Sequence, residues 1–370
     1  MKQHAKINQA GPGILPRLPV WNYWFAYLPF ATAAAGFALG GIWTYATPIL
    51  AFVITPLLDW SRPPAPENAT DEAQERARSN SNFDLLVYGT VPLLFVFLGV
   101  FCWLLANVPM SGFELGGNIF SMGLLCGVFG INVGHELGHR SRPHEKLLSQ
   151  WALLGSLYTH FFIEHNRGHH IHVSTPRDPA TSRRGETLYA FWVRSVVMSY
   201  VSAWRIENEQ LRRKGISVYS LRNRMIVYQI MQVALVAGIY LAFGALVAVA
   251  FVAAALIGAL LLETVNYIEH YGLMRREVAP GRYEPVRPQH SWNSDHMFGR
   301  LILFNLPRHS DHHAYAGRKY QMLRSFEAVP TFPAGYPAMM LLSLIPPLWF
   351  MVMDRHLAEW EDFATPAVAA

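Results

Sequence analysis

Long apolar stretches without a charged residue dominate the pattern along this chain. No Asp, Glu, Lys or Arg occurs between Arg17 and Asp59, between Asp84 and Glu114, between Glu114 and Glu136, or between Arg224 and Glu263. A helix needs about 20 apolar residues to span a membrane, so these windows hold two, one, one and two spans. The pattern predicts six transmembrane helices, at about residues 21-41, 43-59, 85-108, 118-138, 225-243 and 246-268.

Composition supports a single membrane domain over residues 1-370 rather than several soluble ones. Hydrophobic residues make up 52% of the chain and charged residues only 15%, below the roughly 25% of ordinary globular domains. The predicted fold class is all-α integral membrane, a six-transmembrane-helix bundle with a polar cap. The apolar runs Leu147–Ile163 and Tyr336–Met353 are expected to lie at the interface or under the cap, because a crossing would reverse the side of every later segment.

The basic residues predict the orientation of this bundle. The formal net charge is +5, but with six spans all 30 Lys and Arg residues fall on the side of the N-terminus. This is the positive-inside bias, so nucleic-acid binding is not needed to explain the charge. Both termini and the segments 140-224 and 274-370 are expected to be cytoplasmic, in a protein integral to the bacterial cytoplasmic (inner) membrane.

Only two cysteines are present, Cys102 and Cys126, and both lie inside apolar windows. They provide neither a disulfide framework nor a Cys-x-x-Cys metal site. An electron carrier built on cysteine ligands is therefore expected to be a separate protein.

Histidines form the most distinctive polar pattern. They occur as His135-Glu-Leu-Gly-His139, His165-Asn-Arg-Gly-His169-His170, Glu269-His270-Tyr271-Gly272 and His309-Ser-Asp-His312-His313. With six spans, all four pieces reach the cytoplasmic mouth of the bundle. A zinc site uses about four ligands, so nine imidazoles predict two metals.

Helical geometry suggests how these histidines divide. Residues four apart share one face of a helix. Each of the pairs His135/His139, His165/His169 and His309/His313 can therefore bind one metal. His170 and His312 are one residue out of phase and point in a neighbouring direction, where a second metal could lie, so the distribution of the histidines between the two metals stays open.

Ligand type alone leaves the metal open between iron, copper, nickel and zinc. His135-Glu136-Leu137-Gly138-His139 also matches the pattern of zinc proteases, in which the glutamate is the general base. That interpretation leaves the other clusters without a role, and it is kept as a remote alternative.

Acidic residues near the histidines are candidates for orienting them. A metal-bound imidazole usually donates its second N–H to a carboxylate, which fixes the ring. The candidates are Glu136, Glu164, Glu263, Glu269 and Asp311. Among the remaining histidines, His160 is expected to pack, His172 to face the site or solvent, and His290 and His296 to support it.

The three multi-histidine clusters resemble those of the membrane di-iron superfamily of desaturases and hydroxylases. Together with Asn266-Tyr267-Ile268-Glu269-His270-Tyr271-Gly272, Trp292-Asn293-Ser294 and Arg308-His309-Ser-Asp-His312-His313-Ala314, they resemble the membrane-bound alkane 1-monooxygenase family over about residues 20 to 355.

That resemblance implies a function and a ligand set. The nine histidines would bind two iron ions, and O2 would hydroxylate alkanes at the terminal carbon to give 1-alkanols. Electrons would come from rubredoxin and rubredoxin reductase. The implied ligands are His135, His139, His165, His169, His170, His270, His309, His312 and His313. A fatty-acyl desaturase or hydroxylase, and a xylene-type methyl hydroxylase, remain alternatives.

Two further hypotheses concern substrate and donor. Ala51, Ile54 and Thr55 on the second span share a helical face and are expected to line an alkane channel open to membrane lipid. The basic patches Arg183-Arg184 and Arg212-Arg213-Lys214 either dock an acidic rubredoxin or simply set the topology.

Overall fold

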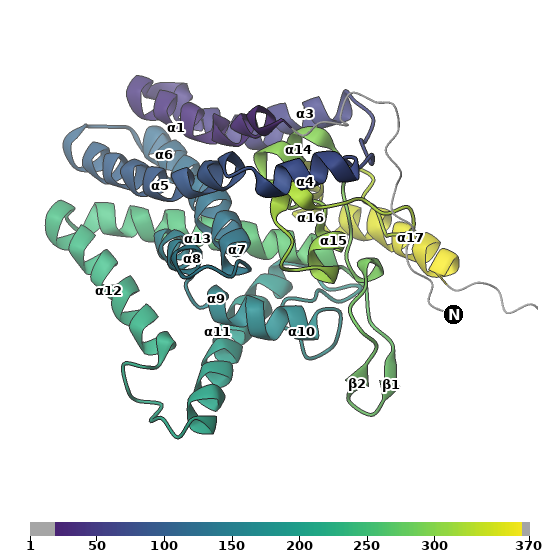
Figure 1. Ribbon diagram of the computed structural model, residues 1–370. Coiled ribbons are helices and arrows are strands. Elements are labelled where there is room, and N and C mark those ends of the chain that lie inside the picture. Colours follow the sequence, from purple (N-terminus) through teal and green to yellow (C-terminus); the bar gives the residue numbers. More distant parts are fainter. Residues whose placement is uncertain (1–18, 365–370) are drawn as a thin grey trace, which may run out of the picture.

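The computed structural model describes residues 19–364, which are mostly helical (Figure 1). Five stretches are long and apolar enough to cross a membrane, namely Gly41–Trp60, Asn82–Asn107, Gly112–Gly138, Arg224–Phe243 and Ala245–His270. The prediction of a mostly helical chain with several membrane-spanning helices is confirmed to this extent. The two termini, predicted to be cytoplasmic, lie outside the described residues.

The first predicted span, residues 21-41, is not among these five. Its residues form the 3-10 helix η1 (Val20–Tyr27) followed by α1 (Leu28–Leu39). The first turns of η1 contain Trp21, Asn22 and Trp24. Their polar groups lower the mean hydropathy of this segment. Gly40 then takes a positive φ of 63°, which glycine tolerates, and the chain turns into the next stretch. The sixth span stays a prediction.

The stretch Gly41–Trp60 is a composite of four short helical pieces. They are η2 (Gly41–Tyr45), α2 (Ala46–Ile49), the π-helical turn η3 (Leu50–Ile54) and α3 (Thr55–Trp60). Near its end, the buried carboxylate of Asp59 accepts hydrogen bonds from the backbone N–H groups of Phe298 (2.8 Å) and Gly299 (3.2 Å). These bonds satisfy the first turn of α14 (Met297–Ile302) and tie it to the spanning stretch.

The stretch that carries the first histidine cluster begins earlier than predicted. It consists of α6 (Gly112–Leu125), the π-helical turn η4 (Cys126–Asn132) and α7 (Val133–Gly138). The sequence-based boundary at residue 118 is too late, because Ser111 and Glu114 form a capping box that starts the helix at Gly112. Such a box satisfies orphan N–H groups in the first turn.

Three long helices complete the five stretches: α5 (Asn82–Asn107), α12 (Arg224–Phe243) and α13 (Ala245–His270).

Glycines allow the stretch from α6 to α7 to approach α13 closely. A Cβ at Gly258 would lie 2.9 Å from the backbone nitrogen of Gly127, so only glycine permits this contact. Close packing of α6–η4 against α13 brings His135 and His270 to the same end of the bundle.

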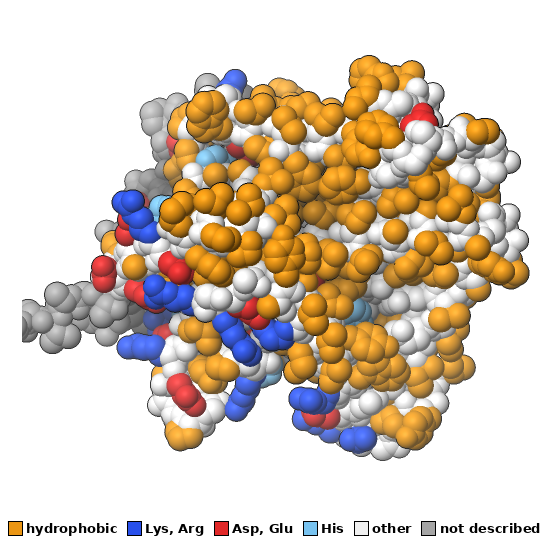
Figure 2. Space-filling model, turned by 180° about the vertical axis from the view of Figure 1, so that it is seen from behind, with side chains coloured by type: hydrophobic (Ala, Val, Ile, Leu, Met, Phe, Trp, Pro, Cys, Tyr) orange, Lys and Arg blue, Asp and Glu red, His pale blue; other side chains and the backbone are white. Residues whose placement is uncertain are grey.

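Exposed apolar side chains cover the outside of the spanning helices, including Val96, Val233, Leu241 and Val249. Figure 2 shows apolar side chains over much of one face of the molecule, with Lys and Arg gathered along its border. This distribution matches a surface that faces lipid.

The remaining elements form the cap. Its helices are α4 (Asp71–Ser79), α8 (Pro143–Gly155), α9 (Phe161–Glu164), η5 (His165–His169), α10 (His170–His172), α11 (Leu188–Arg213), η6 (Pro288–His290), α14, α15 (His309–Ala314), η7 (Tyr320–Met322), α16 (Tyr336–Ser343) and α17 (Pro346–Ala364). A small antiparallel hairpin joins β1 (Glu277–Ala279) to β2 (Arg282–Tyr283), pairing Glu277 with Tyr283.

Neither of the two doubtful apolar runs is a single helix. The run Leu147–Ile163 is broken after α8, where Leu157 takes a positive φ of 51°, and it resumes at α9. The run Tyr336–Met353 is broken between α16 and α17, whose first residue is Pro346. Both breaks return the chain toward the histidines.

Candidate metal centre

The nine histidines of the four motifs converge into two groups. His135, His139, His165, His170 and His312 form the five-histidine group, and His169, His270, His309 and His313 form the four-histidine group. Within each group the nitrogen atoms offered all lie within 4.8 Å of one another. They come from α7, η5, α10, α13 and α15, which meet where the cap covers the bundle (Figure 1).

Ring nitrogens in the five-histidine group face one another at the spacing of ligands on a single ion. The Nε2–Nε2 distances are 2.8 Å for His135 and His312, 3.1 Å for His139 and His165, 2.9 Å for His165 and His170, and 3.2 Å for His170 and His312. Two nitrogens that bind one ion at about 2.1 Å and at a right angle lie about 3 Å apart. The group therefore fits one metal.

The four-histidine group is fully buried and equally close. The Nε2 atoms of His169 and His313 lie 3.2 Å apart. The ring centroids of His309 and His313 lie 4.4 Å apart, and those of His169 and His270 lie 4.9 Å apart. His170 and His313 stack across the two groups with their centroids 4.5 Å apart, so the two candidate sites are neighbours.

One pairing that helical spacing allows is not found. His165 and His169 could have shared a metal on a regular helix, but they belong to different groups. The cause is the π-helical turn η5, which runs from His165 to His169. Backbone bonds in a π turn link residues five apart, so His170 rather than His169 comes beside His165. The pairs His135/His139 and His309/His313 each stay within one group, as helical spacing allows.

Burial keeps the imidazoles of the cap segments neutral. It lowers the pKa of His139 to about 3. Burial, followed by the proximity of other histidines, lowers the pKa of five more well below the usual value: His165, His170, His309, His312 and His313. A neutral imidazole has one nitrogen lone pair available for a metal.

Several of these buried nitrogens have no hydrogen-bond partner among the described residues. They include Nδ1 of His309 and Nδ1 of His313, both in the four-histidine group. Buried polar atoms without partners are costly, and a cation in this group would satisfy ring nitrogens of this kind. The donor set, nitrogen without sulfur, suits iron among other metals.

Asp178 is a functional carboxylate that sequence reasoning missed. Its Oδ2 accepts a 2.9 Å hydrogen bond from Nδ1 of His169 and another from the hydroxyl of Thr181. Burial acts to raise the pKa of Asp178, but the proximity of His169 and these hydrogen bonds hold it below the usual value. This is the carboxylate–histidine arrangement that orients a metal ligand. The only signal was its place in Thr175-Pro176-Arg177-Asp178, shortly after His169.

The carboxylates singled out from the sequence lie in different surroundings. Oε2 of Glu269 lies 3.1 Å from Nε2 of His309. Glu136 accepts from Arg140 at 2.7 Å and Asp311 accepts from Arg318. Neither of these two forms a hydrogen bond or ion pair with a ligand histidine among the described residues.

The other two candidates are buried near the helix α11. Glu164 lies 3.4 Å from the hydroxyl of Ser202, and burial raises its pKa well above the usual value. Glu263 accepts hydrogen bonds from Tyr158 (2.7 Å) and Ser195 (2.5 Å).

Four other histidines that the sequence placed near the site lie outside both groups. His290 lies 3.6 Å from Glu284, and His296 contacts the hydroxyl of Ser294 at 3.1 Å. His172 is partly exposed. His160 is buried, and burial lowers its pKa to about 4.

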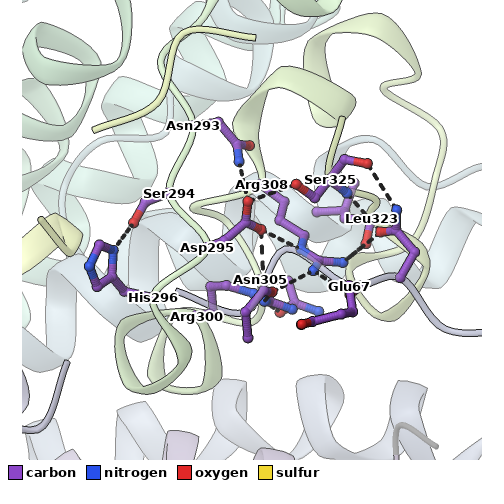
Figure 3. A network of polar contacts seen from close by, with 12 residues as sticks. Glu67, Asn293, Ser294, Asp295, His296, Arg300, Asn305, Arg308, Leu323 and Ser325 are labelled. Carbon is purple, nitrogen blue, oxygen red and sulfur yellow. Dashed lines mark hydrogen bonds and ion pairs between the residues drawn. The ribbon is translucent and has the colours of Figure 1, made fainter. Parts of the chain in front are cut away.

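A buried arginine, Arg308, fixes the start of the histidine helix α15 (Figure 3). Its Nε donates to Asp295 at 3.2 Å, its Nη1 to Leu323 O at 2.9 Å and Asn68 Oδ1 at 3.1 Å, and its Nη2 to Glu67 O at 2.9 Å. Arg300 adds a second cation that faces Asp295 at 3.8 Å. The network joins three chain segments immediately beside His309.

An apolar cavity of about 100 Å³ leads to both groups. Its inner end is lined by His135 and His165 of the five-histidine group, by His309 of the four-histidine group, and by Glu269. Apart from Asn132, Asn266 and two threonines, the remaining lining side chains are apolar or glycine. They come from the N-terminal helices, α6–η4, α13, α14 and α16.

Two of the three predicted channel residues line this cavity, and one does not. Ala51 and Thr55 are part of its wall. Ile54 is 42% exposed on the outside, so the expectation for Ile54 is not met. The π-helical turn η3 ends at Ile54 and shifts the phase on which the three residues would share one face.

Comparison with known proteins agrees with this site. A family model described as fatty acid desaturase matches residues 113–343. The chain is 40% identical to alkane 1-monooxygenase 1 of Pseudomonas aeruginosa over 356 residues, which cover 94% of this chain and 90% of the relative. It is 40% identical to the alkane 1-monooxygenase of Ectopseudomonas oleovorans over 305 residues (82% and 76%). It is 32% identical to the xylene/toluene monooxygenase hydroxylase component of Pseudomonas putida over 302 residues (78% and 79%).

The class defined by the helical fold, the histidine groups and the matching model is the fatty acid desaturase family of membrane proteins. Within that class, the chain belongs to the alkane 1-monooxygenase family. The resemblance inferred from the histidine motifs is confirmed.

Proposed function

We propose that the protein is an O2-dependent alkane 1-monooxygenase that converts alkanes to 1-alkanols at two irons. The nine histidines would hold the irons, one in the five-histidine group and one in the four-histidine group. The observation that carries the proposal is the apolar cavity, because it ends on histidines of both groups. Iron bound there would supply the oxidising power drawn from O2 and two electrons.

The cavity explains how a substrate without polar groups is bound. Apolar burial contributes roughly 0.8 kcal/mol per CH2, and Ala51, Leu50 and Met340 provide such surface. An alkane that enters a narrow, closed cavity presents its chain end to the histidines. Shape therefore favours the terminal carbon over the interior carbons, although interior C–H bonds are weaker.

Glu269 is the one carboxylate that lines the cavity. Its Oε2 lies beside Nε2 of His309, and the hydroxyl of Tyr336 lies beside the same carboxylate. A carboxylate in this position can accept a hydrogen bond from the hydroxyl of the product or hold a proton. Asp178 orients His169 through Nδ1, and Glu136, Glu164 and Asp311 contribute charge and packing around the ligands.

Rubredoxin acting as a separate protein is the electron donor we infer, and a cleft beside the five-histidine group is one place where it could dock. Lys146 lines this cleft together with Arg140, Arg167 and Arg224, which are paired with carboxylates, and His139 lies in its wall. A donor docked there would come close to a ligand of one iron. The patches Arg183-Arg184 and Arg212–Lys214 are secondary candidates.

The membrane arrangement belongs to the same proposal. A single domain would span the bacterial cytoplasmic membrane with six helices, with Val20–Leu39 as the sixth, and with both termini and the cap in the cytoplasm. The exposed apolar surface of the spanning helices and the position of the basic residues support it.

Metal content and product analysis test the function. Detergent-purified protein from iron-replete cells should contain near two irons per chain. With rubredoxin, its reductase and NADH it should convert octane or dodecane to the 1-alkanol. One zinc and negligible iron would instead support the protease alternative, and an unsaturated product from an acyl substrate would support a desaturase.

A methyl hydroxylase is the alternative with direct support, because a xylene/toluene monooxygenase component is 32% identical. The higher identity to alkane 1-monooxygenases favours alkanes. A turnover rate with xylene that exceeds the rate with octane would reverse this preference.

A further inference from the structure

A small basic pocket lies beside the cap helix α11, apart from the two histidine groups. Four arginines line it: Arg177, Arg183, Arg194 and Arg205. Its volume is about 110 Å³, which is enough for one phosphate-sized group. Met198 and Val201 of α11 form its apolar side.

Arg194 builds the pocket rather than recognising a ligand. Its guanidinium donates to Glu186 at 2.7 Å, to Pro179 O at 2.9 Å and to Thr181 O at 3.0 Å. These bonds fold the segment 179–186 against α11 and give the pocket a fixed wall.

The one carboxylate in the wall is already engaged. Both oxygens of Asp178 have partners, with Oδ2 bonded to His169 and Thr181 and Oδ1 accepting from Ala180 N. It therefore does not compete for the arginines.

The other three arginines are available. The guanidinium groups of Arg177, Arg183 and Arg205 form no hydrogen bond or ion pair with the described residues, and all three residues are exposed. Three unpaired cations around so small a space favour a multivalent anion, and arginine matches phosphate oxygens with paired N–H donors.

The apolar side of the pocket continues along α11. Val193, Val197, Met198 and Val201 are exposed on one face of this helix, Val193 by 69%. At its start, the hydroxyl of Tyr189 donates to Leu344 O at 2.7 Å. Leu344 and Ile345 are also exposed, so the apolar face extends from α11 to the junction of α16 and α17.

The placement of α11 agrees with a position at the membrane surface. In Figure 1 it runs across the direction of α13, which is long and apolar enough to span the bilayer. Its second half carries Arg205, Arg212 and Arg213. A helix with an apolar face and flanking basic residues lies in the interface, where anionic lipids attract it.

We propose that the basic pocket binds the phosphate of an anionic membrane phospholipid, with the acyl chains lying along the apolar face of α11. Charge complementarity selects the phosphate, and the exposed valines select a lipid rather than a free anion. Binding there would anchor the segment that carries Asp178 and would thereby help to hold His169 in place. The lipid-binding test below does not depend on the enzymatic activity.

Retention of phosphatidylglycerol tests the proposal. The full-length iron-loaded protein and the variant Arg183→Gln/Arg205→Gln are reconstituted with phosphatidylcholine and a minor fraction of phosphatidylglycerol. Each is then released into mild detergent and examined by native mass spectrometry. Each basic residue near an anionic membrane adds to the free energy of lipid binding. Because the double variant loses two of them, we expect it to bind phosphatidylglycerol about 25-fold more weakly than the unmodified protein.

The matched control is Arg212→Gln/Arg213→Gln, which removes the same charge from the end of the same helix, outside the pocket. It should retain phosphatidylglycerol better than the pocket variant does, because it loses only part of the general attraction to the membrane surface and keeps every arginine of the pocket. Both double variants change exposed side chains, so their melting temperatures should stay unchanged and a folding defect would be recognised.

Three results would overturn the proposal. The first is equal phosphatidylglycerol retention by the pocket variant and the control. The second is displacement of the lipid by inorganic phosphate at equal concentration, because the pocket would then recognise a free anion. The third is unchanged lipid retention together with slower oxidation of reduced rubredoxin, which would assign the pocket to the electron donor.

Discussion

At the residue scale, the contact between Asp178 and His169 has the clearest functional consequence. A carboxylate that accepts the second N–H of a metal ligand fixes its ring, and losing it typically reduces metal affinity or activity 10- to 100-fold. We therefore expect Asp178→Asn to lower both iron retention and kcat by about that factor while leaving KM for octane nearly unchanged. Elemental analysis and steady-state rates would measure this.

The control for this prediction is Asp71→Asn, which removes a carboxylate whose side chain is 96% exposed. It should leave iron content and kcat unchanged. An Asp178→Asn protein with full iron content and full kcat would show that His169 does not need the carboxylate.

Arg308 is the second residue that acts through a ligand. Its guanidinium is buried and contacts Asp295, Asn68 and the backbone before α4. Lysine keeps the charge but cannot reproduce this set of bonds. Arg308→Lys should lower the melting temperature and reduce iron occupancy, since breaking a buried charged network costs about 3–5 kcal/mol.

Arg276→Lys provides the comparison, because the side chain of Arg276 is 85% exposed and its ion pair with Glu284 spans 4.0 Å. Its melting temperature should match that of the unmodified protein, because exposed pairs contribute about 0–1 kcal/mol. Equal stability of the two variants would rule out the positioning role of Arg308.

The residues show what the sequence could and could not provide. Nine histidines in short clusters were recognisable because imidazole is a common metal ligand and several of the intervals place two rings on one helical face. Asp178 and Arg308 were not, because their partners are distant in sequence and no spacing rule relates them. For Glu136 and Asp311, proximity in sequence to histidine suggested a role, whereas in the fold they accept hydrogen bonds from Arg140 and Arg318.

At the scale of elements, π-helical turns decide which side chains meet. The turns η3, η4 and η5 interrupt helices that the apolar pattern describes as regular. Charge-free windows predicted five of the spanning stretches, since length and hydropathy alone define them. The face of the helix on which each residue lies was not predictable, because a single π turn rotates all residues after it around the helix axis. This is why His165 separates from His169 and why Ile54 leaves the cavity wall.

The second spanning stretch allows a matched test of the cavity. Ala51 lines the cavity and Ile54 faces outward, although they are three residues apart. We expect Ala51→Trp to fill part of the cavity and to shift the ratio of kcat/KM toward shorter alkanes. For each CH2 no longer buried, the longer substrate should lose roughly 0.8 kcal/mol, about fourfold in kcat/KM.

Ile54→Trp introduces the same indole on the outer face and should leave the chain-length profile unchanged. Competition between hexane, octane and dodecane, followed by gas chromatography of the alcohols, would measure both profiles. Identical profiles for the two variants would remove Ala51 from the substrate path.

At the scale of the whole molecule, the histidines join parts of the chain that are far apart in sequence. The two groups draw on α7, η5–α10, the end of α13 and α15, and each group contains residues from at least three of these segments. The sequence did not predict the helix α11, because its apolar positions alternate with polar ones inside a long polar segment and resemble that segment in composition. Its long apolar face became visible only in the fold.

Metal removal should therefore loosen one end of the molecule and leave the rest intact. A ligand present at 100 times its dissociation constant stabilises the folded state by about 2.7 kcal/mol, and without iron Nδ1 of His309 and Nδ1 of His313 have no hydrogen-bond partner among the described residues. We expect the chelated protein to melt at a lower temperature than the iron-loaded protein. Amide hydrogen exchange should rise in α7, η5 and α15, and stay unchanged in α5 and α12, which contribute no histidine to either group. Re-addition of iron should restore the protection. A uniform rise in exchange, or no rise, would mean that the spanning helices rather than the metals hold the four histidine segments together.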